Sequence, residues 1–236
     1  MTYNFFLTQL VNHQLFSVKF DSRRQSLDDI QAIDYTDDEI LANPMLIQHI
    51  KKPSEELALE AVKINYACFQ YIENQTEEIC LAAVEQNGEM LDFVLVQTPE
   101  ICIAAVEQDG YSLFYVKEQT DSICLASVKS NPTSIKYVKN QTEEICLEAI
   151  RNDSNMISRV NNPTELMCSL VIADNPMLLK YIAVEYQTDE LCLAAVSSMP
   201  DSLEYVINQT PEICLAAVNR NSTILRLVDQ SIFSRK

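Results

Sequence analysis

Cysteine is the residue type best suited to chemistry in this sequence, and its spacing indicates its role. Of eight cysteines in 236 residues, seven recur every 22 residues, with one interval of 24: Cys80, Cys102, Cys124, Cys146, Cys168, Cys192 and Cys214. A zinc site needs cysteine or histidine at short spacing, which is missing, and His13 and His49 lie outside the series. The series therefore predicts one small buried side chain per repeat, with no metal and no other cofactor. Cys68, outside the series, is the candidate for a reactive thiol.

Carboxylates are the second group that could do chemistry. The sequence has 34 acidic and 17 basic residues, a formal net charge of -17. Pairs such as Glu77-Glu78 and Glu143-Glu144 directly follow a threonine, where a helix N-terminus favours acids. The sequence contains no nucleophile elbow, zinc-protease motif or phosphate-binding loop, so we expect no enzymatic activity. The acidic excess also argues against a nucleic-acid partner, because displacing counterions needs lysine and arginine.

These residues belong to an internal repeat of about 22 residues. Six units begin with the dipeptide Gln-Thr, at Gln75, Gln97, Gln119, Gln141, Gln187 and Gln209. A serine or threonine occupies the second position in all eight units: Ser54, Thr76, Thr98, Thr120, Thr142, Thr164, Thr188 and Thr210. The repeat therefore covers residues 53–230.

Each unit reads as two short helices. Thr98, Pro99 and Glu100 form an N-terminal helix signal, and the apolar run 101–106 follows. A break such as Asp109-Gly110 then marks a helix stop and a new cap. Helices this short are marginal alone and must stack on their neighbours. The pattern predicts an all-α fold, an α-solenoid of about eight short helical hairpins. A leucine-rich repeat of the same period is the competing fold, disfavoured by the polar Glu89 at a leucine position.

The remaining segments differ from the repeat. In residues 1–26, Phe16, Val18 and Phe20 alternate with polar residues, which predicts a small N-terminal β-hairpin cap. Residues 27–52 read as a helical linker with a degenerate half-repeat at 42–50, and residues 231–236 as a C-terminal tail. We read no secretory signal and no apolar stretch long enough to span a membrane. We therefore expect a cytoplasmic protein with reduced cysteines and no membrane contact.

The phrase Gln-Thr-x-Glu-Ile-Cys-Leu-Ala-Ala-Val, followed by Asn-Gly and Leu-x-Tyr-Val, resembles a repeat family abundant in mimivirus-like giant DNA viruses. The resemblance covers residues 53–230. It implies helical repeats without established catalytic residues and with a largely uncharacterised role, in the host cytoplasm or the virion. The sixth unit departs from the pattern at Leu166, Ser169 and Leu170.

One outward-facing position of the repeat is mostly acidic. The position two before the cysteine holds Glu56, Glu78, Glu100, Glu144, Glu190 and Glu212, with Ser122 and Leu166 as exceptions. Residues 53–230 contain 27 acids and 10 bases, the whole net charge of the chain. This acidic row either keeps an elongated body soluble or attracts a basic partner, and Glu78, Glu100 and Glu144 are candidate contacts.

Departures from the repeat mark further candidate contacts. Phe114 occupies an outward position that is polar in the other units, with Tyr111 one turn earlier and Leu95 in the preceding unit. Phe114 is either part of an exposed contact patch or folded under the adjacent helix. A two-residue insertion lies near Tyr186. It predicts either a longer second helix or a bulged loop, and either one would perturb the groove between successive units.

The favoured function is a non-enzymatic protein–protein interaction scaffold, and the alternative is a self-assembling structural component of a virion or virus-built compartment. The sequence does not fix the oligomeric state.

Overall fold

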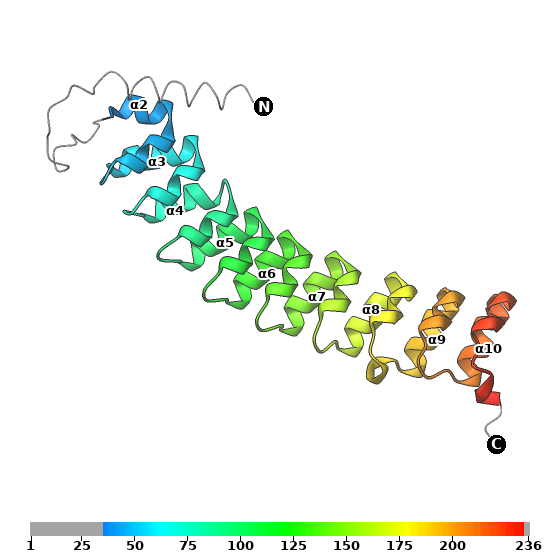
Figure 1. Ribbon diagram of the computed structural model, residues 1–236. Coiled ribbons are helices and arrows are strands. Elements are labelled where there is room, and N and C mark those ends of the chain that lie inside the picture. Colours follow the sequence, from blue (N-terminus) through cyan, green and yellow to red (C-terminus); the bar gives the residue numbers. More distant parts are fainter. Residues whose placement is uncertain (1–34, 234–236) are drawn as a thin grey trace, which may run out of the picture. The chain divides into compact units, whose positions relative to one another are not determined.

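α-Helices of eight to ten residues alternate with 3-10 helices of six residues in this protein (Figure 1). The structure is a computed structural model, and it describes residues 35–233. Within that range all regular elements are helical, which confirms the all-α prediction and excludes a leucine-rich repeat there. The predicted hairpin at residues 1–26 lies outside the described residues.

Eight α-helices each precede a 3-10 helix in the part of the chain that is described. The α-helices are α3 (Glu55–Ile64), α4 (Glu77–Val84), α5 (Pro99–Gln108), α6 (Asp121–Ser130), α7 (Glu143–Asn152), α8 (Glu165–Asp174), α9 (Asp189–Ser198) and α10 (Pro211–Arg220). Their partners are η3 (Tyr66–Tyr71), η4 (Gly88–Phe93), η5 (Gly110–Tyr115), η6 (Pro132–Tyr137), η7 (Ser154–Arg159), η8 (Pro176–Tyr181), η10 (Pro200–Tyr205) and η11 (Ser222–Leu227). We call each pair a layer.

Four further elements of the described chain lie outside these eight layers. α2 (Asp37–Ala42) and η2 (Pro44–His49) form a shorter pair, and η2 overlaps the predicted half-repeat. η9 (Val184–Tyr186) is an extra turn at the two-residue insertion. η12 (Gln230–Phe233) extends into the segment predicted as a tail.

The predicted N-caps begin every α-helix of the layers. In seven of the eight, the Ser or Thr hydroxyl oxygen accepts a hydrogen bond from the backbone N–H three residues later, as between Thr120 and Ile123. Thr76 is the exception, because its Oγ1 is buried without a hydrogen-bond partner. The caps satisfy backbone donors that a helix start leaves free.

The second helix of each layer is a 3-10 helix. The apolar pattern of the sequence predicted a helix here but could not tell a 3-10 helix from an α-helix. An Asn or Asp side chain caps seven of the eight, accepting from the backbone N–H two residues later, as Asp109 does from Tyr111. A 3-10 helix rises about 2.0 Å per residue and an α-helix about 1.5 Å. Six 3-10 residues therefore carry the chain back along most of a ten-residue α-helix.

Consecutive layers pack against each other, α-helix on α-helix and 3-10 helix on 3-10 helix (Figure 1). Most layers fill the core from the same positions. In α4 and η4 these are Ile79, Cys80, Ala83, Leu91 and Val94, all buried. The core is therefore a continuous apolar strip between the two rows of helices.

Glutamine side chains join successive connectors, the segments that link one layer to the next. In Gln119, Nε2 donates to the Tyr137 carbonyl at 2.9 Å, and Oε1 accepts from the Lys139 N–H at 2.9 Å. The glutamines that make the same two bonds, 18 and 20 residues ahead, are Gln75, Gln97, Gln119, Gln141, Gln187 and Gln209. We call these six residues the connector glutamines. They hold neighbouring connectors at a fixed distance.

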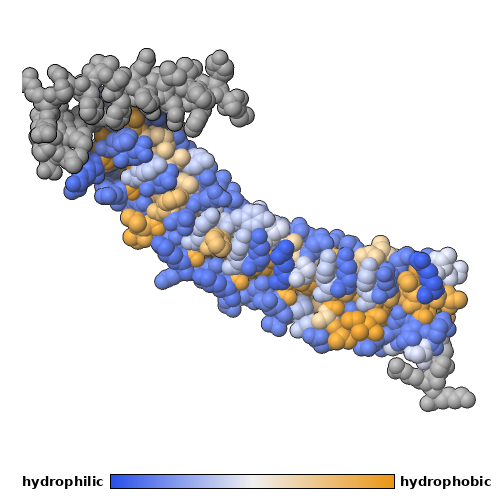
Figure 2. Space-filling view, viewed as in Figure 1, coloured by the Kyte–Doolittle hydropathy of each residue, from blue (hydrophilic) through white to orange (hydrophobic). Residues whose placement is uncertain are grey.

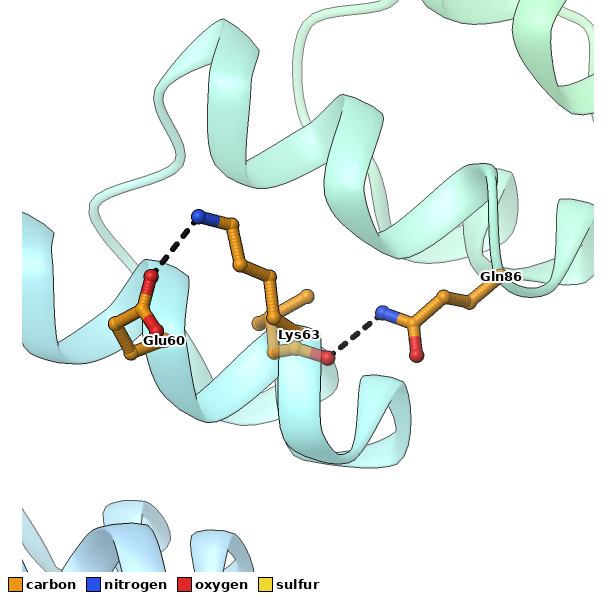
Figure 3. Close-up of polar contacts among 4 residues, drawn as sticks. Glu60, Lys63 and Gln86 are labelled. Carbon is orange, nitrogen blue, oxygen red and sulfur yellow. Dashed lines mark hydrogen bonds and ion pairs between the residues drawn. The ribbon is translucent and has the colours of Figure 1, made fainter.

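Polar side chains also join the layers at the C-terminal ends of the α-helices. Gln86 Nε2 donates to the Val62 carbonyl of the preceding layer at 2.8 Å (Figure 3). The Gly88 N–H donates to Gln108 Oε1 of the following layer at 2.7 Å. Figure 3 also shows the ion pair between Lys63 and Glu60, 2.9 Å long. Both edges of the α-helical row thus carry bonds between layers.

Close packing explains the glycines at positions 88 and 110. The sequence predicted instead that they mark helix ends in the left-handed conformation. Neither glycine has a positive φ. A Cβ at Gly110 would lie 2.6 Å from the Ser127 carbonyl oxygen, and one at Gly88 would lie 2.5 Å from that of Ala105. Each glycine lets the start of a 3-10 helix touch the backbone of the next α-helix.

Gln119→Ala should destabilise the protein by about 1–3 kcal/mol, because two backbone groups lose their partners. Urea unfolding followed by far-UV circular dichroism measures this as a lower midpoint. Gln48→Ala, which truncates an exposed glutamine of η2, is the matched control and should leave the midpoint unchanged. Equal midpoints for both variants would show that the connector glutamines do not stabilise the fold.

Gly110→Ala should also destabilise the protein, by about 1–3 kcal/mol, because the new methyl group overlaps the Ser127 carbonyl. The same unfolding measurement applies. Ser222→Ala changes the same repeat position in the last layer, where the side chain is exposed, and should shift stability by less than about 0.5 kcal/mol. A wild-type midpoint for Gly110→Ala would contradict the close-packing explanation.

Candidate partner-binding surfaces

Phe114 is an exposed side chain at the centre of a group of aromatic rings. Its side chain is 65% exposed, so it does not fold under the adjacent helix. Its ring centroid lies 5.2 Å from that of Tyr115 and 5.4 Å from that of Tyr137. Tyr111 meets Tyr137 edge to face at 6.2 Å. We call Tyr111, Phe114, Tyr115 and Tyr137 the aromatic cluster, which spans η5 and η6.

Polar contacts fix the edge of the aromatic cluster. Thr133 Oγ1 donates to the Tyr111 hydroxyl at 2.7 Å, and hydrogen bonding from Thr133 lowers the pKa of Tyr111. Lys136 Nζ lies 4.8 Å from the Tyr111 ring centroid and 4.5 Å from that of Tyr137. Cation–π contact thus places one positive charge beside the rings. Sequence reasoning missed Lys136 and Tyr137, although they lie 22 residues after Phe114 and Tyr115.

Leu95 is not part of the aromatic cluster, because it lies on the connector between η4 and α5. Its backbone N–H is bound by Gln75, and its side chain is exposed. Val96, next to it, is 76% exposed. Sequence reasoning missed Val96, although asparagine is the commonest residue at this position. Leu95 and Val96 therefore form a separate apolar point on the connector surface.

The acidic row is exposed along the α-helices. Glu78, Glu100 and Glu144 occupy the first turns of α4, α5 and α7, and all three side chains are exposed. None of them is in an ion pair within residues 35–233. Their charges are therefore available to a molecule that approaches this side.

α8 and its connectors form the irregular layer of the described chain. Proline replaces the connector glutamine at position 163, and Leu166 and Leu170 are exposed on α8. A cleft of about 210 Å³ lies between α8 and α9. Tyr186, partly buried on η9, forms part of its wall. The insertion thus adds a short turn beside this cleft, and not a longer second helix.

All eight cysteines are free and buried, as the spacing predicted. Burial raises the pKa of Cys80 and of Cys192 to about 11. Cys68 is not the exposed thiol that a reactive role requires, since it is fully buried and burial raises its pKa to about 11. Within residues 35–233, no group of cysteine, histidine and acidic side chains could hold a metal ion.

Comparison with known protein families gives a match to part of the repeat. A family model described as "Domain of unknown function (DUF4116)" matches residues 54–97 and 76–121. The two stretches start at the N-caps Ser54 and Thr76, so the model spans two layers and shifts by one layer between matches. No curated protein and no solved structure matches the chain. In the described part of the chain, no helix is long and apolar enough to cross a membrane.

The native protein should react slowly with a thiol reagent such as dithionitrobenzoate at about pH 8, because its thiols are buried and protonated. After unfolding in guanidinium, all eight cysteines should react rapidly. The absorbance of the released thiolate counts them in both states. Rapid reaction of several thiols without denaturant would contradict the buried positions.

Proposed function

We propose that the chain is an α-solenoid that serves as a non-enzymatic scaffold for binding another protein. The layered packing and the connector glutamines support a stiff array, because six of the eight layers bond to the segment one repeat ahead through a connector glutamine. A stiff surface loses little conformational entropy when it binds.

The aromatic cluster is the observation that carries this proposal. Large exposed aromatic residues dominate binding energy at many protein interfaces, and they bind best when already held in place. Phe114 is exposed while its ring contacts Tyr115 and Tyr137, and Thr133 and Lys136 hold the neighbouring tyrosine. The partner would cover Phe114 at little cost in side-chain entropy.

The acidic row supports a partner with a basic surface. Charges that stay unpaired on one side of a protein raise the rate at which an oppositely charged partner associates. Glu78, Glu100 and Glu144 would supply this attraction, and the aromatic cluster would supply the close contact. The resemblance to giant-virus repeats supports a location in the host cytoplasm or the virion.

Assembly with copies of itself is the second candidate. Leu225 of η11 is 57% exposed, whereas Leu203, at the same repeat position one layer earlier, is fully buried. Leu215 of α10 is exposed as well. These residues belong to the face that every earlier layer covers with the next one. A second copy stacked on α10 and η11 would bury Leu215 and Leu225. Such stacking would suit a structural component of a virion or virus-built compartment.

Phe114→Asp should abolish capture of the partner by tagged protein from expressing cells, measured by affinity purification and mass spectrometry. The new carboxylate would be desolvated in the contact. Ser158→Asp adds the same group at the same outward position of η7 and should leave capture unchanged. Light scattering should give equal particle sizes for the wild type and both variants.

Two results would contradict the scaffold proposal. One is equal capture of the same proteins by wild type and Phe114→Asp. The other is an oligomer that becomes monomeric in Phe114→Asp, which would favour self-assembly through the aromatic cluster.

A further inference from the structure

α8 lacks one side chain that every other layer possesses. The position after the repeat cysteine is leucine or isoleucine in seven layers: Leu59, Leu81, Ile103, Leu125, Leu147, Leu193 and Leu215. In α8 it is Ser169. Four residues on, Ala173 stands where most layers have a larger polar or charged residue. Both truncations lie on one side of α8, because residues four apart share a helix face.

These truncations border the cleft between α8 and α9. Ser169 and Ala173 line it from α8, Leu191 and Ala194 line it from α9, and Tyr186 lines it from η9. We call this cleft the α8–α9 notch. Its volume of about 210 Å³ is below the roughly 300–1,000 Å³ of small-molecule sites, so it suits a side chain better than a metabolite.

Two carboxylates are the charged groups of the α8–α9 notch. Glu165 and Glu190 are exposed residues in the first turns of α8 and α9, and both line the cleft. The lining residues include no lysine, arginine or histidine. Neither glutamate is in an ion pair within the described residues. An apolar hollow with two unpaired carboxylates complements an apolar side chain flanked by positive charge.

The layer of α8, which forms one wall of the notch, lacks ties that most other layers have. Pro163 cannot form the two bonds of a connector glutamine, so the connector before α8 is not tied to the next one in this way. α7 and α8 are the least closely packed pair of consecutive α-helices among the layers. Apolar surface is visible over the later helices in the space-filling view (Figure 2), and Leu166 is 52% exposed on α8. α8 is therefore less closely packed on its α7 side than the other α-helices of the layers.

We propose that the α8–α9 notch binds a peptide segment of a partner protein in which a leucine-sized apolar residue is flanked by lysine or arginine. The apolar side chain fills the space that Ser169 leaves open, and the cations pair with Glu165 and Glu190. The proposal rests on the proposed protein-binding function but uses a different surface from the aromatic cluster.

Selection of a phage-displayed library of random 12-residue peptides on the full-length protein tests the notch. We expect the selected peptides to contain an apolar residue between basic ones. Ser169→Leu should reduce their affinity at least about tenfold, as measured by fluorescence polarisation. Ser169→Leu restores the residue of the other layers, so the variant should fold with wild-type or higher stability. Urea unfolding checks that its fold is retained.

Two further variants locate the contact. Ser122→Leu makes the same change at an exposed outward position of α6 and should bind the selected peptides like the wild type. Glu165→Gln with Glu190→Gln should weaken binding and reduce its dependence on salt. Equal affinity of the wild type and Ser169→Leu, or a selection without basic peptides, would overturn the proposal. Phe114→Asp should not affect these peptides, so failure of the notch is distinguishable from failure of the aromatic cluster as a partner site.

Discussion

The hydrogen bonds of the connector glutamines are the interaction on which the regularity of this protein depends. A short helix leaves backbone carbonyls and N–H groups unpaired where it ends, and a connector cannot satisfy them internally. An uncharged amide provides a donor and an acceptor on one side chain, so Gln119 bonds both to the Tyr137 carbonyl and to the Lys139 N–H. A glutamate could only accept, and an asparagine is one methylene shorter. The two bonds tie each connector to the one a single repeat ahead.

A fixed connector spacing makes equivalent residues recur at equivalent places in successive layers. The acidic row is exposed at the same turn of each helix for this reason, and Phe114 can contact Tyr137 of the next layer. The same rule makes an exception conspicuous. Pro163 replaces the glutamine that would tie the connector before α8 to the one before α9, and the insertion and the α8–α9 notch follow within one layer. The α8 layer, one of the two without this bond, thus carries both the insertion and the notch.

The repeat, the threonine caps and the buried cysteines could be predicted from the sequence because each depends on residues a few positions apart. Three features could not. The 3-10 geometry of the second helices was hidden because an apolar pair three residues apart, such as Leu91 and Val94, suits both helix types. The role of glutamine was hidden because its partners are backbone groups, which any residue supplies. The exposure of Phe114 and the inclusion of Tyr137 in the aromatic cluster depend on how successive layers pack. The sequence alone left Phe114 either exposed or covered by the adjacent helix.

The cysteines show how one side chain can serve both the core and the connector. In each layer with a connector glutamine, the cysteine Sγ lies 3.4–4.0 Å from its Oε1 and can donate a weak hydrogen bond. The first layer has Pro53 in place of glutamine and Ala58 in place of cysteine, so the two residues are absent together. The sixth layer breaks this pairing, because Cys168 remains although Pro163 removes the acceptor. Cys168 instead borders the α8–α9 notch. Apolar packing is thus sufficient to explain cysteine at this position, and the bond to glutamine is an addition that most layers use.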